Sequence, residues 1–294
     1  MSWLKKHPLP PKKPAQNDGE TKDSDNESIY SNEDASNRGH GTDDTLDVTR
    51  ILEGHGIPCC LVGIAALVFY GAGRLRDVSV LLPLTLPEKS HKTQDWEICV
   101  PTDLVPKAAE ILQSEPYSAK YRLVKRWPDY EPLSLIHTYH RFKTKGIFHY
   151  FFLVPSIDVH IDCVPSNFTR SLRGLPYPKL DVCIQSYVDT NDMVALCDII
   201  DGTNVSEEWG ESNLDLEGTT DVQWAKAKNK RGEEFDGKLA LFAWDAPKSK
   251  RELWQSLVRT KEDRLDWTKP KDIFITQYRL IDGPDPWTQL SDMF

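Results

Sequence analysis

The sequence has no excess of positive charge and no long uninterrupted apolar stretch, and each absence excludes a class of protein. Its 36 Lys and Arg residues stand against 45 Asp and Glu, a net charge of -9. A dedicated duplex-DNA-binding protein carries a basic footprint, so we do not expect one here. The longest apolar run, residues 57–73, is interrupted by Gly63 and Gly71 and has no stop-transfer flank. It predicts a buried strand and helix rather than a membrane span, and no membrane partner is expected.

Cysteine is scarce and shows no metal-binding spacing. The six cysteines include no Cys-x-x-C pair, and two of them are adjacent, which is poor geometry for a mutual disulfide. Most lie in apolar runs, as small buried thiols do. We interpret them as reduced structural thiols and expect no zinc site. With no secretory signal at the N-terminus, a cytoplasmic or nucleocytoplasmic protein is predicted. The six are Cys59, Cys60, Cys99, Cys163, Cys183 and Cys197.

The N-terminal segment holds most of the negative charge. Residues 18–47 carry ten acids and two bases, a net of -8 out of -9, which leaves a nearly neutral remainder. Residues 1–44 have few branched apolar side chains and cannot bury enough surface to offset the entropy of ordering, so we predict a disordered acidic tail. Pro8, Pro10 and Pro11 favour a polyproline II segment that could dock on a protein partner. A plain solvated tail is the simpler interpretation.

The apolar pattern of residues 45–190 predicts helices interleaved with strands. Thr102 is the expected N-cap of one helix, because a threonine hydroxyl can accept from the first free N–H groups of a helix. Residues 135–143 and 147–154 flank a Lys-Gly pair and predict a β-hairpin. The remaining expected elements are helices at 45–54, 65–70 and 102–114 and strands at 57–62, 96–100, 121–127 and 157–164.

Beyond residue 190 the pattern is mostly helical. Helices are expected at 192–200, 221–230 and 248–264, whereas residues 271–280 fit a helix or a strand equally well. The order of the elements is α/β in the first half of the chain and mostly helical in the second. We therefore divide the chain into the tail, a sheet-containing domain over 45–190 and a helical C-terminal region over 191–294.

Residues 78–94 do not fit the surrounding pattern. They hold two prolines and have no clear hydrophobic period. Val78-Ser79 can be encoded by GTN-AGT, which matches a 5′ splice donor, and Gln94 by CAG, a 3′ acceptor. The segment is in frame and about as long as a short fungal intron. We hypothesise a retained intron, and a genuine surface insertion is the alternative.

Removal of 78–94 would place Asp77 directly before Asp95. The joined sequence then has a glycine-led helix that ends in Tyr-Gly, an arginine, and two carboxylates that alternate on a strand. This pattern resembles the nucleotidyltransferase superfamily, especially its small antitoxin- and toxin-like members and its fungal branch. The resemblance covers about residues 60–165 and implies an α+β fold, a mixed sheet flanked by helices, with a mostly helical C-terminal part. The residues in register are Gly63, Ala65, Ala66, Leu67, Tyr70, Gly71, Arg74, Asp95 and Glu97.

The two carboxylates suit a hard cation. Asp95 and Glu97 are two residues apart on the expected strand, so both side chains leave the same face. Mg²⁺ is held in this way, by one or two carboxylates together with phosphate oxygens and water. The resemblance implies that Asp95 and Glu97 are catalytic and bind Mg²⁺, which would align an NTP for transfer of a nucleoside monophosphate to an unknown acceptor. Gly63 would lie against the triphosphate and Arg74 would bind substrate.

The family uses a third carboxylate on a later strand. In residues 157–163, Asp158 and Asp162 alternate with His160, so all three are expected on one face. Either aspartate could complete the metal site, and both remain candidates. His160 would contact a phosphate or simply close that face.

Some residues depart from the family pattern. Ile64 follows the first glycine where a second small residue is common, and Glu97 replaces the more common Asp. These departures favour an alternative, a catalytically inactive nucleotidyltransferase-fold protein that binds or scaffolds, such as an accessory member of a fungal metabolite pathway. The basic residues Arg122, Lys125 and Arg126 either flank a nucleotide pocket or form an ordinary basic surface.

Overall fold

The structure, a computed structural model, describes residues 41–72, 95–126, 133–147, 149–203, 205–237 and 241–268. The acidic tail up to residue 40, the segment 78–94 and residues 271–280 therefore lie outside the described residues. The predictions made for them are not tested. Within the described part, the first helix, α1 (Thr42–Gly54), begins at Thr42 rather than at the predicted residue 45. Its first three residues were assigned to the tail, and that boundary was wrong, because Thr42 and Asp44 are buried.

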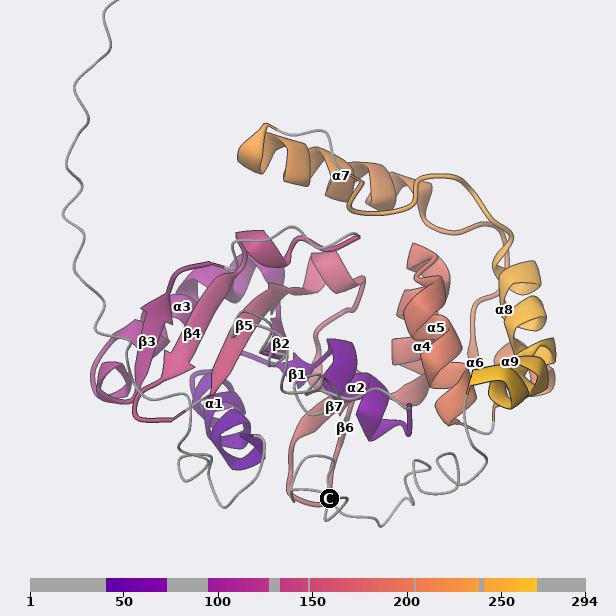
Figure 1. Cartoon of the computed structure of the whole chain (residues 1–294). Coiled ribbons are helices and arrows are strands. Elements are labelled where there is room, and N and C mark those ends of the chain that lie inside the picture. The colour runs from indigo at the N-terminus through magenta and orange to yellow at the C-terminus, as the bar shows by residue number, and fades with distance from the viewer. Residues whose placement is uncertain are drawn as a thin grey trace, which may run out of the picture. The chain divides into compact units, whose positions relative to one another are not determined.

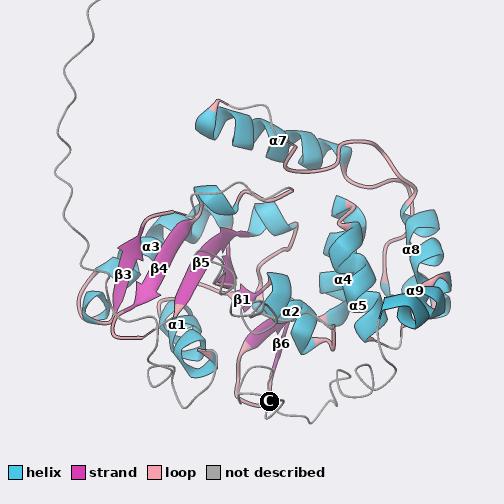
Figure 2. Ribbon diagram, in the orientation of Figure 1, coloured by secondary structure: helices cyan, strands magenta, loops and turns pink. Residues whose placement is uncertain are grey.

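Five strands form one mixed sheet (Figure 1, Figure 2). Their order across the sheet is β1-β2-β5-β4-β3. β2 and β5 run parallel, whereas β1 pairs with β2, and β4 with β5 and β3, in the antiparallel sense. The predicted strand 96–100, the predicted hairpin and the α+β class are confirmed. The strands are β1 (Cys60–Leu61), β2 (Trp96–Val100), β3 (Tyr121–Val124), β4 (His140–Thr144) and β5 (Tyr150–Pro155).

The two faces of β2 enter different apolar clusters. Trp96 and Ile98 pack into the larger core, which also holds Leu52 from α1 and Leu112 from α3 (Val105–Gln113). Cys99, the residue after Ile98, points to the opposite face and packs into a second cluster with Phe152. Since successive strand side chains point to opposite faces, this split follows from the period of two in the sequence.

The helix α2 (Gly63–Phe69) follows β1 directly and is anchored by aromatic side chains. Phe69 stacks on Tyr177 with ring centroids 3.9 Å apart. The hydroxyl of Tyr70 donates a hydrogen bond to the carbonyl of Pro178 at 2.6 Å. Both partners belong to or flank a two-stranded sheet that was not predicted, β6 (Phe168–Arg170) and β7 (Pro176–Pro178). These contacts hold the C-terminal end of α2 against β7.

The predicted strand at 157–164 was wrong. Residues Ser156–Val159 form a short 3-10 helix, and His160 follows in the left-handed region with φ 53°. The N–H of Ile161 donates back to the carbonyl of Ser156 at 3.2 Å, so the backbone turns instead of extending. Thr102 contributes to this turn, because its hydroxyl accepts from the N–H of Ile157 at 3.0 Å. Thr102 is therefore not the helix N-cap that the sequence predicted.

The C-terminal part is helical, as expected, but it begins earlier. The helix α4 (Leu180–Thr190) lies within the range assigned to the sheet domain. Side chains of Asp192, Ser206, Asp221 and Ser249 cap the helices that follow them, each accepting from a backbone N–H three residues on. The predicted helix 248–264 is divided at Thr260. The helices are α5 (Met193–Gly202), α6 (Glu207–Asn213), α7 (Val222–Asp236), α8 (Lys250–Arg259) and α9 (Lys261–Thr268).

Within the described ranges, none of the helices combines the length and the apolar character that a bilayer crossing requires.

Candidate functional site

Asp95, the first predicted metal ligand, is held by an arginine of the same sheet. The Nε of Arg141 donates to one carboxylate oxygen at 2.6 Å and its Nη2 to the other at 3.3 Å. The Asp95 side chain is 2% exposed and that of Arg141 is 18% exposed, so the carboxylate lies out of solvent. The Arg141 guanidinium also lies 4.4 Å from the ring centre of Tyr150. Because a two-pronged arginine pair engages both oxygens, the carboxylate is already charge-compensated by the protein.

Glu97, the second predicted ligand, lies against Gly63. A Cβ added to Gly63 would be 2.2 Å from Oε1 and 2.9 Å from Oε2 of Glu97. Gly63 also has φ +61°, which disfavours other residues. The glutamate therefore fills the space in front of the first residue of α2. A carboxylate is electrostatically suited to that place, because the free N–H groups at a helix start attract negative charge.

Asp158, one candidate for the third carboxylate, is paired with α7. Its carboxylate accepts from Nη2 of Arg231, and its backbone carbonyl accepts from Nζ of Lys228 at 3.1 Å. Asp158 and Lys228 are both buried. Burial lowers the pKa of the Lys228 ammonium, an effect that the charge of Asp158 opposes. These contacts join the turn after β5 to a helix of the C-terminal part.

Asp162, the other candidate, is exposed, and the turn separates it from Asp158. Its backbone carbonyl accepts from the side-chain amide of Asn167 at 2.9 Å. The prediction that Asp158, His160 and Asp162 share a strand face was wrong, because they do not lie on a strand.

His160 points toward the C-terminal helices. Its Nε2 lies 3.2 Å from a carboxylate oxygen of Asp221 and its Nδ1 lies 3.7 Å from one of Asp189. Lys250 donates to Asp189 at 2.9 Å. These four side chains line a cavity of about 520 Å³. His160 thus takes part in a network between the sheet domain and α7 and α8.

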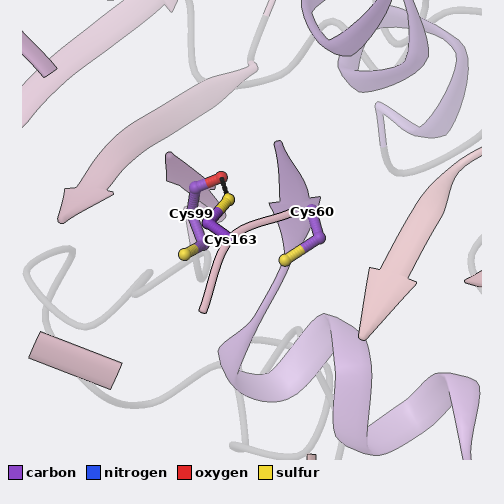
Figure 3. Close-up of side chains that lie close together, drawn as sticks. All are labelled: Cys60, Cys99 and Cys163. Atoms are coloured by element: carbon purple, nitrogen blue, oxygen red, sulfur yellow. Dashed lines mark hydrogen bonds between the residues drawn. The ribbon is translucent and has the colours of Figure 1, made fainter. Parts of the chain in front are cut away.

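Three cysteine side chains, and not the predicted acids, lie close enough together to hold one metal ion. Among the residues that the structure describes, the close group of three or more His, Cys, Asp or Glu side chains is Cys60, Cys99 and Cys163, with all sulfurs within 4.8 Å of one another. The predicted acids are described, and they do not form such a group. Figure 3 shows the three thiols, which come from β1, β2 and the loop after the 3-10 turn.

The three thiols are buried and reduced. Cys60 and Cys99 are 0% exposed and Cys163 is 4% exposed. Cys60 and Cys99 are paired residues in the antiparallel β1-β2 ladder, so their side chains leave one face. The Cys163 thiol donates to the carbonyls of Pro58 at 3.5 Å and Cys99 at 3.6 Å. Burial raises the pKa of the Cys60 thiol.

This cluster was not predicted, because the spacing of the cysteines along the chain does not reveal it. One signal was present: Cys60 and Cys99 both fall within expected strands. Their pairing and the approach of Cys163 depend on which strands become neighbours, and local spacing does not contain that information.

Two other predictions have separate outcomes. Arg74 lies outside the described residues, so its role as a substrate ligand is not tested. In the basic cluster, the Arg126 guanidinium lies 5.1 Å from the ring centre of Phe235 on α7. Arg126 thus contacts an aromatic side chain of the C-terminal part.

The chain was also compared with known proteins. No protein-family model matches it, and a search of curated proteins finds no matching sequence. The resemblance to nucleotidyltransferases therefore stays a prediction from the sequence pattern.

Proposed function

We propose that this chain is a non-catalytic binding or scaffold protein built on a nucleotidyltransferase-like sheet. The observation that carries the proposal is the buried pair between Asp95 and Arg141, with both carboxylate oxygens engaged at 2.6 and 3.3 Å. A metal ligand must offer an oxygen to a cation. Here the cation that contacts both oxygens of Asp95 is the guanidinium of Arg141. Mg²⁺ would have to compete with Arg141 for this carboxylate, and loss of the arginine would leave the buried Asp95 charge without its partner, which costs several kcal/mol.

The other acids support the same proposal. Glu97 fills the space before Gly63, where the resemblance would place a triphosphate. An incoming triphosphate would meet a carboxylate of the same charge sign. Asp158 is compensated by Arg231. In the proposed function, the acids stabilise the sheet and fasten it to the C-terminal helices, which leaves a stable module for a partner.

The catalytic alternative makes an opposite prediction. It requires Asp95 and Glu97 to bind Mg²⁺ together, so turnover of an NTP would depend on Asp95. Asp103 is an exposed acid in the 3-10 turn after β2 and is a matched control.

A turnover assay distinguishes the two functions. The purified chain, with and without residues 78–94, is incubated with Mg²⁺ and each of the four NTPs, and pyrophosphate release is followed. We expect no Mg²⁺-dependent release from either form. Release that Asp95→Asn abolishes and Asp103→Asn preserves would establish the enzyme and refute the scaffold.

A further inference from the structure

We propose that Cys60, Cys99 and Cys163 form a binding site for one soft monovalent cation, Cu(I), coordinated by three sulfurs. The site is independent of the acid pairs discussed above and goes beyond the proposed scaffold function. It rests on the convergence of three chain segments, on the spacing of the sulfurs and on their burial.

The convergence involves parts of the chain far apart in sequence. The β1-β2 register sets Cys60 beside Cys99. The turn after β5 returns the chain so that the Cys163 sulfur lies 3.6 Å from the Cys99 carbonyl (Figure 3). Cys183 is also buried, at 1% exposure, but it belongs to the other apolar cluster. The three thiols therefore differ from a singly buried cysteine such as Cys183, because they lie next to one another.

The spacing of the sulfurs fits one metal ion. With metal–sulfur bonds of about 2.3 Å, three sulfurs around a trigonal ion lie about 4 Å apart. In this protein all pairs lie within 4.8 Å. Side-chain rotations that move the sulfurs by less than an ångström would bring them to this spacing. The backbone register of β1 and β2 would remain unchanged.

The ligand set and its surroundings select the ion. Thiolates favour soft cations such as Cu(I) and Zn²⁺ over Mg²⁺ or Ca²⁺. Zn²⁺ favours four ligands. Within the described part of the chain, no fourth His, Cys, Asp or Glu joins the three sulfurs. The three cysteines are 0%, 0% and 4% exposed, so solvent water has little access to act as a fourth ligand. Three-coordinate Cu(I) meets these limits better than Zn²⁺.

Binding is an exchange of protons for the metal. Each thiol that coordinates releases its proton to solvent as the sulfur–metal bond forms, and the copper is supplied and retained as Cu(I), so no electron is transferred. The bound ion would link β1, β2 and the loop at Cys163. The protein should therefore become more stable on binding, since the site does not exist in the unfolded chain.

A competition titration tests the site. The reduced full-length chain is titrated without oxygen against the Cu(I) complex of bicinchoninate, whose colour falls as copper is removed, and intact mass gives the stoichiometry. We expect one Cu(I) per chain and a rise in melting temperature, with much weaker retention of Zn²⁺ in a parallel titration. Mutation of residues that only support a metal ligand typically lowers metal affinity about 10–100-fold. Cys163→Ala removes a ligand itself, so it should lower Cu(I) affinity by more than about 100-fold.

The control is Cys183→Ala, which removes an equally buried thiol outside the group and should leave Cu(I) affinity unchanged. Far-UV circular dichroism shows whether each variant is folded, and Cys163→Ser replaces Cys163→Ala if that variant is not. Two results would overturn the site: no Cu(I) retained by the reduced chain, or equal Cu(I) affinity in the folded Cys163 variant.

Discussion

Single charged residues on the sheet are compensated by partners on neighbouring elements. Asp95 has Arg141 of the next-but-one strand, and Asp158 has Arg231 of α7. The two pairs differ from surface ion pairs because one partner in each is almost fully shielded, with side-chain exposures of 2% and 5%. Breaking such a pair leaves a buried charge without its partner, whereas exposed pairs contribute little.

Arg141→Gln should lower the free energy of unfolding by about 3 kcal/mol, since it leaves the Asp95 carboxylate buried and uncompensated. The measurement is urea denaturation. Arg251→Gln is the matched control, because Arg251 pairs with Glu211 and Glu217 at a side-chain exposure of 41%. The control should cost much less, because an exposed ion pair contributes little to stability. Equal losses would mean that the Asp95 pair is no stronger than a surface contact.

His140 should make stability depend on pH. Burial, together with the charge of Arg126, lowers the pKa of this imidazole from its usual 6.5. Between the lowered value and 6.5 the unfolded chain binds more protons than the folded one, so stability rises with pH in that window. Denaturation series below pH 7 should show a shallower rise for His140→Gln than for the natural chain. An unchanged slope would assign the dependence to other groups.

At the scale of elements, α2 is positioned by a close approach of its first residue to β2. Gly63 and Gly146 both have positive φ, +61° and +81°. Only Gly63 of these two has neighbours within reach of an added Cβ, the atoms of the Glu97 carboxylate. The backbone strain of an alanine is therefore similar at the two positions, but the steric cost differs.

Gly63→Ala should cost about 1 kcal/mol more stability than Gly146→Ala, because the Glu97 carboxylate must leave its place at the start of α2. In a Glu97→Ala background the two substitutions should cost the same, which a double-mutant cycle by urea denaturation measures. If the difference persists without Glu97, then the contact with Glu97 is not its cause.

The helix α7 is fastened to the turn after β5 by Arg231 and Lys228. We expect Arg231→Gln to speed amide hydrogen exchange in α7 while exchange in β2 and β5 changes little. Lys230→Gln is the neighbouring control, since Lys230 pairs with Glu234 at exposures of 75% and 63%. Faster exchange spread evenly over the sheet would show general destabilisation rather than release of the helix.

The elements that sequence reasoning predicted are those with a local cause. The strand 96–100 lies between an acidic residue and a proline and has the expected alternation, and Gly63 marks the start of α2. The alternation at 157–163 was misleading, because Ser156–Val159 form a 3-10 turn in which the N–H of Ile157 donates to the hydroxyl of the distant Thr102. The Arg141 pair and the thiol group depend on which distant segments become neighbours in the sheet, and the local sequence pattern does not give that order.

At the scale of the whole molecule, the protein is an α+β fold in which charged residues join a mixed sheet to a helical C-terminal part. The retained-intron hypothesis for residues 78–94 also concerns the whole molecule, because it decides whether the protein in the cell contains this segment. It predicts that the major spliced transcript lacks these codons. Sequencing of cDNA measures this, and a major message that contains them would establish the segment as a genuine insertion.

In the proposed function, Asp95 and Glu97 stabilise the fold and do not bind a metal–nucleotide complex. The decisive measurement is calorimetric titration of the purified chain with Mg²⁺ and a non-hydrolysable ATP analogue. We expect no binding heat, either for the full chain or for the form without 78–94. Stoichiometric binding that Asp95→Asn removes, in a variant shown to be folded, would contradict the claim and favour a nucleotidyltransferase.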